Sequence, residues 1–317
     1  MKESKHKLLT LAALTTIAAG VIHLSNRVIV ASSQLKEMLD FSNHNYYKWR
    51  FGKIYYTKKG TGSPILLIHD AMPGASGYEW SRVEKHLAQE HTVYTLDLLG
   101  CGRSDKSSIT YTNFVYVQMI SDFIKKIIGQ KTDVIASGFS GSFVTMACHN
   151  EKELFNKIML VNPPSLTQLK QMPNRKDRLL KAALEIPIFG TLVYHMIVSR
   201  DNINNLFIEK MYYNPFHVDN QMADAYYEAA HKGGYYTRFL YSSLAAKYIN
   251  INICHALKAL DNSIYIVEGE TEPNGKAVTD DYCASNPAIE VSVLKETKHL
   301  PHVEAPEAFL EQVKIFF

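Results

Sequence analysis

The chain has 317 residues, of which 46% are apolar and 11% aromatic, and its formal net charge is only +3. This length and composition fit one large domain with a sizeable core, and the mild charge without a Lys/Arg-rich arm argues against nucleic acid as a partner. The four cysteines lack paired spacing, so they predict neither a zinc site nor a disulfide framework (Cys101, Cys148, Cys254 and Cys283).

The N-terminal region predicts a membrane anchor within residues 1–31. Residues 8–24 carry no formal charge and follow three lysines, and their number is at the short end of what spans a bilayer. A cleaved signal peptide is the competing interpretation, but residues 29–31 match a cleavage site poorly. A packed or amphipathic helix also stays open, because threonines and His23 dilute the apolar run. The flanking charges place the catalytic domain outside the cytoplasm, whereas the unpaired cysteines argue mildly for the opposite side.

From residue 44 the pattern alternates strand and helix. Residues 46–50 and 53–58 predict a hairpin, and the fully apolar run 64–68 predicts a strand that is buried on both faces. A helix over 79–89, a strand over 92–97, a helix over 112–128 and strands ending near 137 and 161 continue the series. This order is typical of an α/β fold with a mostly parallel, doubly wound sheet.

The most informative segment is Asp133-Val-Ile-Ala-Ser-Gly-Phe-Ser-Gly-Ser142, an apolar strand that ends in Gly-x-Ser-x-Ser. Small residues two positions before and after Ser140 are what a tight strand-to-helix turn requires around a strained central residue. The helix that follows directs its positive end at that residue. We therefore interpret Ser140 as a nucleophile; an ordinary glycine- and serine-rich turn is the alternative.

A helical insertion interrupts the alternation over residues 163–254. Strand patterns resume at 263–267 and 290–294, and a closing helix is predicted over 306–317. We expect a core formed by residues 44–162 and 255–317, with the insertion as a cap over the carboxyl edge of the sheet, where such folds bind ligands.

A serine nucleophile needs a base and an acid that orients the base. His299 follows the last predicted strand and can reach back toward Ser140; His302 is the rival, although it fits better as a structural residue at a helix start. The acid is expected on the loop after residues 263–267, where Glu272 is the first candidate. Other carboxylates nearby stay open as alternatives (Glu270, Asp280 and Asp281).

An acyl transfer also needs N–H donors for the oxyanion. We expect the backbone N–H of Gly141, at the start of the helix, and that of Ala71, on the loop after the first buried strand. Both donors are backbone groups, so side-chain identity barely constrains them.

Four sequence blocks resemble the α/β-hydrolase superfamily in type and order: residues 69–74, Asp97-Leu-Leu-Gly-Cys-Gly-Arg-Ser104, 138–142 and 299–306. The resemblance covers roughly residues 46–317 and is strongest to the capped, serine-nucleophile branch. It implies the α/β-hydrolase fold, Ser140 as nucleophile, His299 as base and an acid at or near Glu272. Dehalogenase and epoxide-hydrolase relatives use an aspartate nucleophile, and a serine at position 140 argues against both.

Three positions depart from the family pattern. Asp70 replaces the usual glycine after His69, Ser142 replaces a glycine, and the acid is Glu rather than Asp. A carboxylate at Asp70 would oppose a developing oxyanion unless it is paired or points away.

These features predict a membrane-anchored serine hydrolase that cleaves an ester or other acyl bond of a small, hydrophobic substrate. An acyltransferase and a non-catalytic ligand- or partner-binding protein are the alternatives. No cofactor is implied, because neither a dinucleotide fingerprint nor a Walker loop nor zinc-ligand spacing is present.

Overall fold

The computed structural model describes residues 2–39 and 45–317; the expected start of the core at residue 44 lies outside them. A sheet of eight strands forms the centre of the molecule, in the order β1-β2-β4-β3-β5-β6-β7-β8. β1 and β2 form the predicted antiparallel hairpin, β2 pairs antiparallel with β4, and the remaining pairs are parallel. The strands are β1 (Asn45–Trp49), β2 (Gly52–Lys59), β3 (Ser63–Ile68), β4 (His91–Leu96), β5 (Thr132–Ser137), β6 (Phe155–Val161), β7 (Ile264–Gly269) and β8 (Glu290–Leu294).

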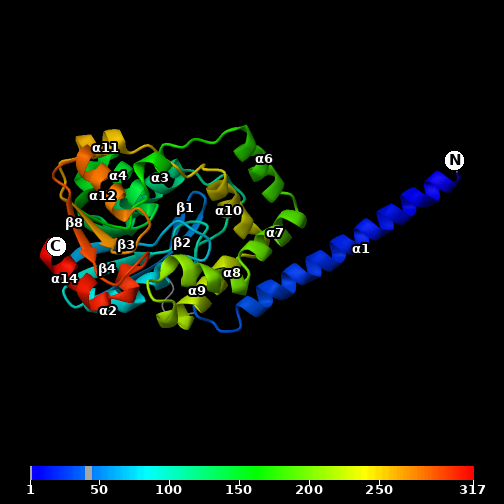
Figure 1. Cartoon of the computed structure of the whole chain (residues 1–317), viewed down its shortest axis with the longest axis horizontal. Coiled ribbons are helices and arrows are strands. Elements are labelled where there is room, and N and C mark those ends of the chain that lie inside the picture. Colours follow the sequence, from blue (N-terminus) through cyan, green and yellow to red (C-terminus); the bar gives the residue numbers. More distant parts are fainter. Residues whose placement is uncertain (1, 40–44) are drawn as a thin grey trace.

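Helices cover both faces of the sheet, which gives the α/β-hydrolase architecture (Figure 1). Alternate residues of β3 enter two separate apolar clusters: Leu66 and Ile68 pack on one face, Ile65 and Leu67 on the other. This two-sided burial explains why the strand is apolar throughout. One face is covered by α3 (Asn113–Phe123), α4 (Ser140–Asn150), α11 (Cys254–Ala259) and α12 (Gly275–Ser285), the other by α2 (Ser81–Leu87) and α14 (Pro306–Phe316).

The segment between β6 and β7 is helical, as its pattern predicts. Among the described residues it contains no strand, and α6–α10 lie between the sheet and the N-terminal helix in Figure 1. Its α-helices are α5 (Leu166–Leu169), α6 (Arg175–Leu184), α7 (Phe189–Ile197), α8 (Arg200–Leu206), α9 (Asn220–His231) and α10 (Arg238–Ala245). Their apolar cluster includes Ala75 and Leu300 of the core loops and Val303 of the short helix α13 (Pro301–Glu304), so the cap packs directly on the edge that carries the candidate residues.

The N-terminal helix α1 (Lys2–Ser33) projects away from this body and packs only its final turns against the cap (Figure 1). Residues Ala13–Ser33 are long and apolar enough to cross a membrane, and little of that stretch is buried in the protein. A membrane anchor and a signal segment both have this length and apolar composition near an N-terminus.

The Asp97–Ser104 block forms a tight loop around a buried ion pair. The carboxylate of Asp97 is fully buried and accepts two bonds from the Arg103 guanidinium, at 2.7 and 2.9 Å. Burial alone would raise the pKa of Asp97, but the Arg103 cation and its hydrogen bonds lower it to about 2. Gly102 is required because a Cβ there would lie 2.3 Å from the carboxylate. This loop supports the candidate site, since the N–H of Leu98 donates to His69 Nε2.

We expect Arg103→Met to lower the free energy of unfolding by about 3–5 kcal/mol, because the substitution leaves the Asp97 carboxylate buried and unpaired. Urea denaturation at pH 7 measures this change, with Arg82→Met as the control. Arg82 forms a partly exposed pair with Asp219, so its loss should cost about 0–1 kcal/mol. Because the pKa of Asp97 is depressed from 3.8 to about 2, the parent's advantage should shrink as pH falls through that window. Equal losses in both variants would contradict this account.

Candidate active site

The strand-to-helix turn is centred on Gly138. β5 ends at Ser137, Gly138 has φ +55°, and Phe139 already has helical dihedrals (φ −56°, ψ −29°). The strained apex that the sequence analysis placed at Ser140 therefore lies two residues earlier, and Ser140 is the first residue of α4. The shift is physically natural, because a glycine adopts positive φ without the steric cost that a serine would incur.

The carboxylate of Asp70 occupies the space next to this apex. A Cβ at position 138 would lie 2.3 Å from Cγ of Asp70, so only glycine fits there. Asp70 Oδ1 accepts hydrogen bonds from the N–H groups of Ala71 and Phe139, both at 2.7 Å. Phe139 follows the apex, and Ala71 lies on the loop after the first buried strand. Backbone N–H groups at these two positions form the oxyanion hole in this type of turn.

Ala71 and Phe139 thus supply the two N–H groups that bind the Asp70 carboxylate, and the role of Ala71 in an oxyanion hole stays a prediction. The N–H of Gly141, which the sequence analysis had favoured, instead donates to Gly138 O at 3.1 Å inside the first turn of α4. The N–H of Gly141 is not one of the two donors because the apex lies two residues before Ser140.

The hydroxyl of Ser140 is hydrogen-bonded to the loop that carries Asp70. Its side chain is fully buried, and its hydroxyl donates to the backbone carbonyl of His69 at 2.5 Å. His69 is itself fixed between two backbone groups, Asp70 O at 2.7 Å and Leu98 N–H at 3.0 Å, and burial lowers the pKa of its imidazole. Ser140 therefore helps to hold the loop that carries Asp70, and its role as a nucleophile stays a prediction.

The structure does bring His299 and Glu272 together. His299 Nδ1 lies 3.1 Å from Glu272 Oε1, whereas the neighbouring carboxylate of Glu270 accepts the N–H of Glu296. The rival His302 is fully buried and stacks on Trp80 with ring centroids 4.2 Å apart.

Asn162, at the end of β6, aligns the loops that carry this pair. Its amide nitrogen donates to the carbonyls of Lys298 and His299, and its amide oxygen accepts the N–H of Gly269, just before the Glu272 loop. Asn162 adopts a positive φ of 43°, a conformation that asparagine tolerates better than most residues.

The other ring nitrogen of His299 faces Asp70. Nε2 lies 3.8 Å from Asp70 Oδ2, so the imidazole stands between two carboxylates. Burial alone would lower the pKa of His299, but the interactions with Asp70 and Glu272 raise it to about 10. His299 is consequently an imidazolium at neutral pH.

These groups line a cavity of about 270 Å³ at the carboxyl edge of the sheet. Asp70, Gly138 and Phe139 form one end, the loop after β6 forms a side, and Glu272 and His299 complete the wall. Among the described residues, no group of three or more His, Cys, Asp or Glu side chains is arranged to hold a metal ion. The cavity is thus lined by the Asp70 carboxylate and the His299 imidazolium, while the N–H donors of Ala71 and Phe139 are bonded to Asp70 Oδ1.

Sequence reasoning missed Gly138, Phe139 and Asn162 as site residues. A signal for Gly138 was available in the sequence. Asp70 is unusual at its position, and a glycine directly after the elbow strand leaves the space that the Asp70 side chain needs. Asn162 carries no such signal, since a polar residue after a strand is common.

The family model of the alpha/beta hydrolase family matches residues 65–312. Because this match covers most of the chain, the protein belongs to that family. Among solved structures, the epoxide hydrolase CorEH superposes with a TM-score of 0.71 at 18% identity, covering 87% of this chain and 98% of the other. At this identity the similarity shows the fold.

Curated relatives match a shorter stretch. A 2-hydroxy-6-oxo-6-(2'-aminophenyl)hexa-2,4-dienoic acid hydrolase from Metapseudomonas resinovorans is 30% identical over 113 residues, 35% of this chain and 39% of the relative. A soluble epoxide hydrolase from Corynebacterium sp. (strain C12) is 26% identical over 110 residues, 35% of this chain and 38% of the relative. The matched stretch is thus about two fifths of each relative, and these relatives are hydrolases.

We expect that the double variant Gly138→Ser, Asp70→Gly reacts covalently with a fluorophosphonate probe while the parent does not. The new serine stands at the apex beside the two N–H donors, which Asp70 no longer occupies. Adding His299→Ala should slow the labelling at least about 100-fold, the usual contribution of a general base. In-gel fluorescence measures the rates, and Gly138→Ser alone is the control because its side chain clashes with Asp70. Labelling of the parent, lost in Ser140→Ala, would instead support Ser140.

The protonation of His299 gives a second test. An NMR titration of the histidine rings should show His299 losing its proton near pH 10, and Asp70→Asn should move that value down toward 6.5 by removing one negative charge. Because the folded pKa is raised, the stabilisation from this proton is complete below about pH 6.5 and is lost as pH rises through about 10. His302, with its pKa lowered to about 3 by burial, is the internal reference that should not titrate between pH 5 and 10. A parent value near 6.5 would contradict the paired-carboxylate arrangement.

Proposed function

We propose that this chain is an α/β-hydrolase in which Asp70 takes the place of the usual elbow nucleophile, and that it hydrolyses an epoxide through a covalent ester. One observation carries the proposal: Asp70 Oδ1 sits between two N–H donors while Oδ2 faces the His299 imidazolium at 3.8 Å. One oxygen is held for charge stabilisation, and the other is available for attack.

In the first step, Asp70 Oδ2 forms a bond to an epoxide carbon, and the carbon–oxygen bond of the ring breaks. The released alkoxide takes the proton of the His299 imidazolium and becomes a hydroxyl group. Esterification removes the negative charge of Asp70, one of the two charges that hold the pKa of His299 high. His299 is therefore left neutral and oriented by Glu272, ready to act as a base.

In the second step, neutral His299 takes a proton from water, and the resulting hydroxide attacks Cγ of Asp70. The oxyanion forms on Oδ1, where the N–H groups of Ala71 and Phe139 already point. Collapse breaks the bond from Cγ to the alkyl oxygen, and the departing alkoxide takes the proton of the new carboxylic acid. The products are a diol, the Asp70 carboxylate and the His299 imidazolium, so the starting state is regenerated.

The charge state of His299 favours an epoxide over a substrate that releases a stable anion. An imidazolium has a proton to give, and an epoxide oxygen needs one, whereas a departing halide would leave His299 protonated and unable to activate water. The partial similarity to the soluble epoxide hydrolase from Corynebacterium sp. (strain C12) supports this class of substrate. The acyl-enzyme on Ser140 remains the competing mechanism, and it requires the hydroxyl to leave the carbonyl of His69.

We further propose that α1 anchors the protein in a membrane.

A single turnover of styrene oxide in ¹⁸O-water, with the protein in excess, distinguishes the mechanisms. The ester route puts ¹⁸O into the Asp70 carboxylate and leaves the diol unlabelled, because water attacks Cγ rather than the substrate. Mass spectrometry of the peptide that contains Asp70 and of the diol reads both results. Asp70→Asn should reduce turnover by more than about 1000-fold, as expected for loss of a nucleophile. Label found in the diol alone would overturn the covalent step.

Substitutions around His299 assign the remaining roles. His299→Gln should accumulate the ester on Asp70, because no base activates water. Glu272→Gln should slow hydrolysis of the ester, whereas Glu270→Gln, on the same loop but turned to Glu296, should not. Full activity in Ser140→Ala supports Asp70 as nucleophile. No turnover and no adduct across a panel of terminal and internal epoxides would favour the non-catalytic, ligand-binding alternative.

A further inference from the structure

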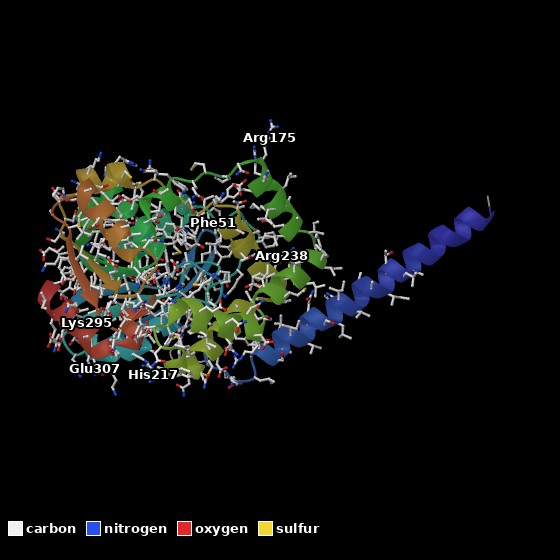
Figure 2. The ribbon with its side chains drawn as sticks, viewed as in Figure 1. Phe51, Arg175, His217, Arg238, Lys295 and Glu307 are labelled. Atoms are coloured by element: carbon white, nitrogen blue, oxygen red, sulfur yellow. The ribbon has the colours of Figure 1, made fainter. Side chains whose placement is uncertain are left out.

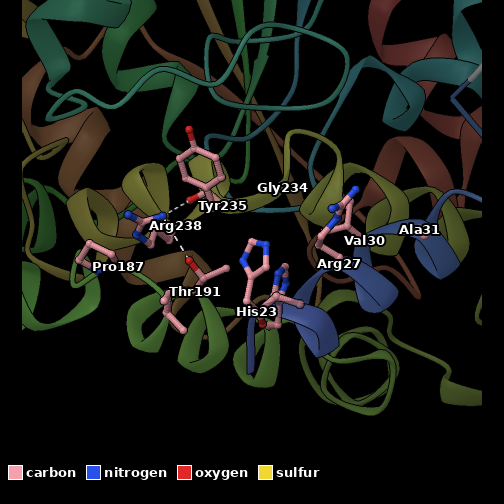
Figure 3. A pocket seen from close by; sticks show the side chains of 12 residues that line it. His23, Arg27, Val30, Ala31, Pro187, Thr191, Gly234, Tyr235 and Arg238 are labelled. Carbon is pink, nitrogen blue, oxygen red and sulfur yellow. Dashed lines mark hydrogen bonds between the residues drawn. The ribbon is translucent and has the colours of Figure 1, made fainter. Parts of the chain in front are cut away.

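A second cavity, of about 580 Å³, lies where the end of α1 meets the cap (Figure 3). Its volume is within the range of pockets that enclose small-molecule ligands. One wall is formed by α1, including Asn26, Arg27 and Ala31, and the other by α7, α10 and the short helix before α10. It shares no residue with the cavity at Asp70, so it is a separate site.

A buried arginine without a close anion lies in the cap wall. Arg238 is 5% exposed, and its guanidinium donates to Thr191 Oγ1 at 3.2 Å and to the carbonyl of Tyr235. Figure 3 shows both contacts at the rim of the cavity, and Figure 2 places Arg238 in the cap on the side toward α1. Among the described residues, no carboxylate forms a salt bridge with it, and its Nε has no partner.

The nearest acidic group to Arg238 is already paired. The Glu185 carboxylate attracts Arg238 but accepts Lys181 Nζ at 2.6 Å and the hydroxyl of Ser242 at 2.7 Å, and its backbone carbonyl accepts Arg238 Nη2 at 3.4 Å. The Arg238 guanidinium also lies over the rings of Tyr235 and Phe239. A buried cation without an anion is costly unless something neutralises it. Arg238 therefore brings to the site a positive charge that an anionic ligand could balance, and Arg27 of the α1 wall is a second cation at the same cavity.

Two further buried side chains line the same cavity and have polar atoms without a hydrogen-bond partner among the described residues. Asn26 is 7% exposed and its Oδ1 accepts no hydrogen bond; His195 is 2% exposed and neither ring nitrogen has a partner among the described residues. Unsatisfied polar atoms at this depth are uncommon in folded proteins. Their convergence on one cavity with Arg238 indicates a ligand with a polar head.

The surroundings are apolar and adjoin the helix that is long enough to cross a membrane. Side chains at the turn between α6 and α7 are largely exposed, including Ile186 (48%) and Phe189 (54%), as are Leu24 and Val28 of α1. With α1 in a bilayer, this apolar rim would face the membrane surface, from which a chain-bearing ligand can enter.

We propose that this cavity binds a single-chain anionic amphiphile, with its head on Arg238 and Thr191 and its chain between α1 and the cap. A fatty carboxylate and a single-chain phosphate lipid share this chemistry. Asn26 and His195 would provide hydrogen bonds to the head or to groups next to it. The proposal does not depend on the reaction at Asp70.

The test uses the full chain in phosphatidylcholine nanodiscs with a diazirine-bearing palmitate, and mass spectrometry maps the crosslinks. We expect crosslinks on peptides of α1, α7 and α10. Oleate and oleoyl lysophosphatidate compete if carboxylate and phosphate heads are both accepted, and the stronger competitor identifies the source. Competition by methyl oleate equal to that of oleate would overturn the anionic head, and acetate or inorganic phosphate alone should not compete.

Two matched pairs of variants locate the site. Arg238→Gln should weaken binding about tenfold, the equivalent of about 1.4 kcal/mol, while Arg175→Gln, exposed on the same cap, should not. Ala31→Trp fills the cavity and should abolish the mapped crosslinks, whereas Ala18→Trp, an exposed position earlier on α1, should keep them. If Arg238→Gln fails to fold by circular dichroism, the Ala31 pair decides. Crosslinks that are unchanged in Ala31→Trp would overturn the proposal.

Discussion

The Asp70 carboxylate and a side chain at position 138 cannot both occupy the space in front of α4. The whole site depends on this steric exclusion. Gly138 leaves the turn without a side chain, and Asp70 enters from the neighbouring loop to meet both N–H donors. The acceptor in the turn therefore comes from the loop after β3 rather than from the elbow itself. Everything else in the site, from the buried Ser140 to the charge on His299, is arranged around that carboxylate.

The same carboxylate sets the electrostatics. His299 stands between Asp70 and Glu272 and holds a proton, whereas His69, bonded only to backbone groups, has a lowered pKa. Burial dominates at His69 and lowers its pKa, whereas the two carboxylates beside His299 outweigh the effect of its burial and raise its pKa. The Asp97–Arg103 pair keeps another buried negative charge neutralised beneath the loop that carries Asp70.

Periodicity was sufficient to predict the fold, because strands buried on both faces and the long helical insertion leave strong patterns. The pairing of His299 with Glu272 was also predictable, since loops after adjacent parallel strands meet at one edge. The position of the elbow's apex was not predictable from the sequence. Small residues recur at positions 136, 138, 140 and 142, so the motif fits the turn in more than one register. Only the end of β5 and the position of the Asp70 side chain select Gly138.

The attachment of α1 has a mechanical consequence. The helix packs mainly on α7 and α9, which belong to the cap. If α1 is held in a bilayer, the cap is the part of the protein that packs on the anchored helix, and the sheet is connected to the membrane through the cap. Any rearrangement that separates cap from sheet must then either tilt the helix in the lipid or swing the core through the solvent. Bilayer thickness and lateral pressure would enter directly into the energy of that movement.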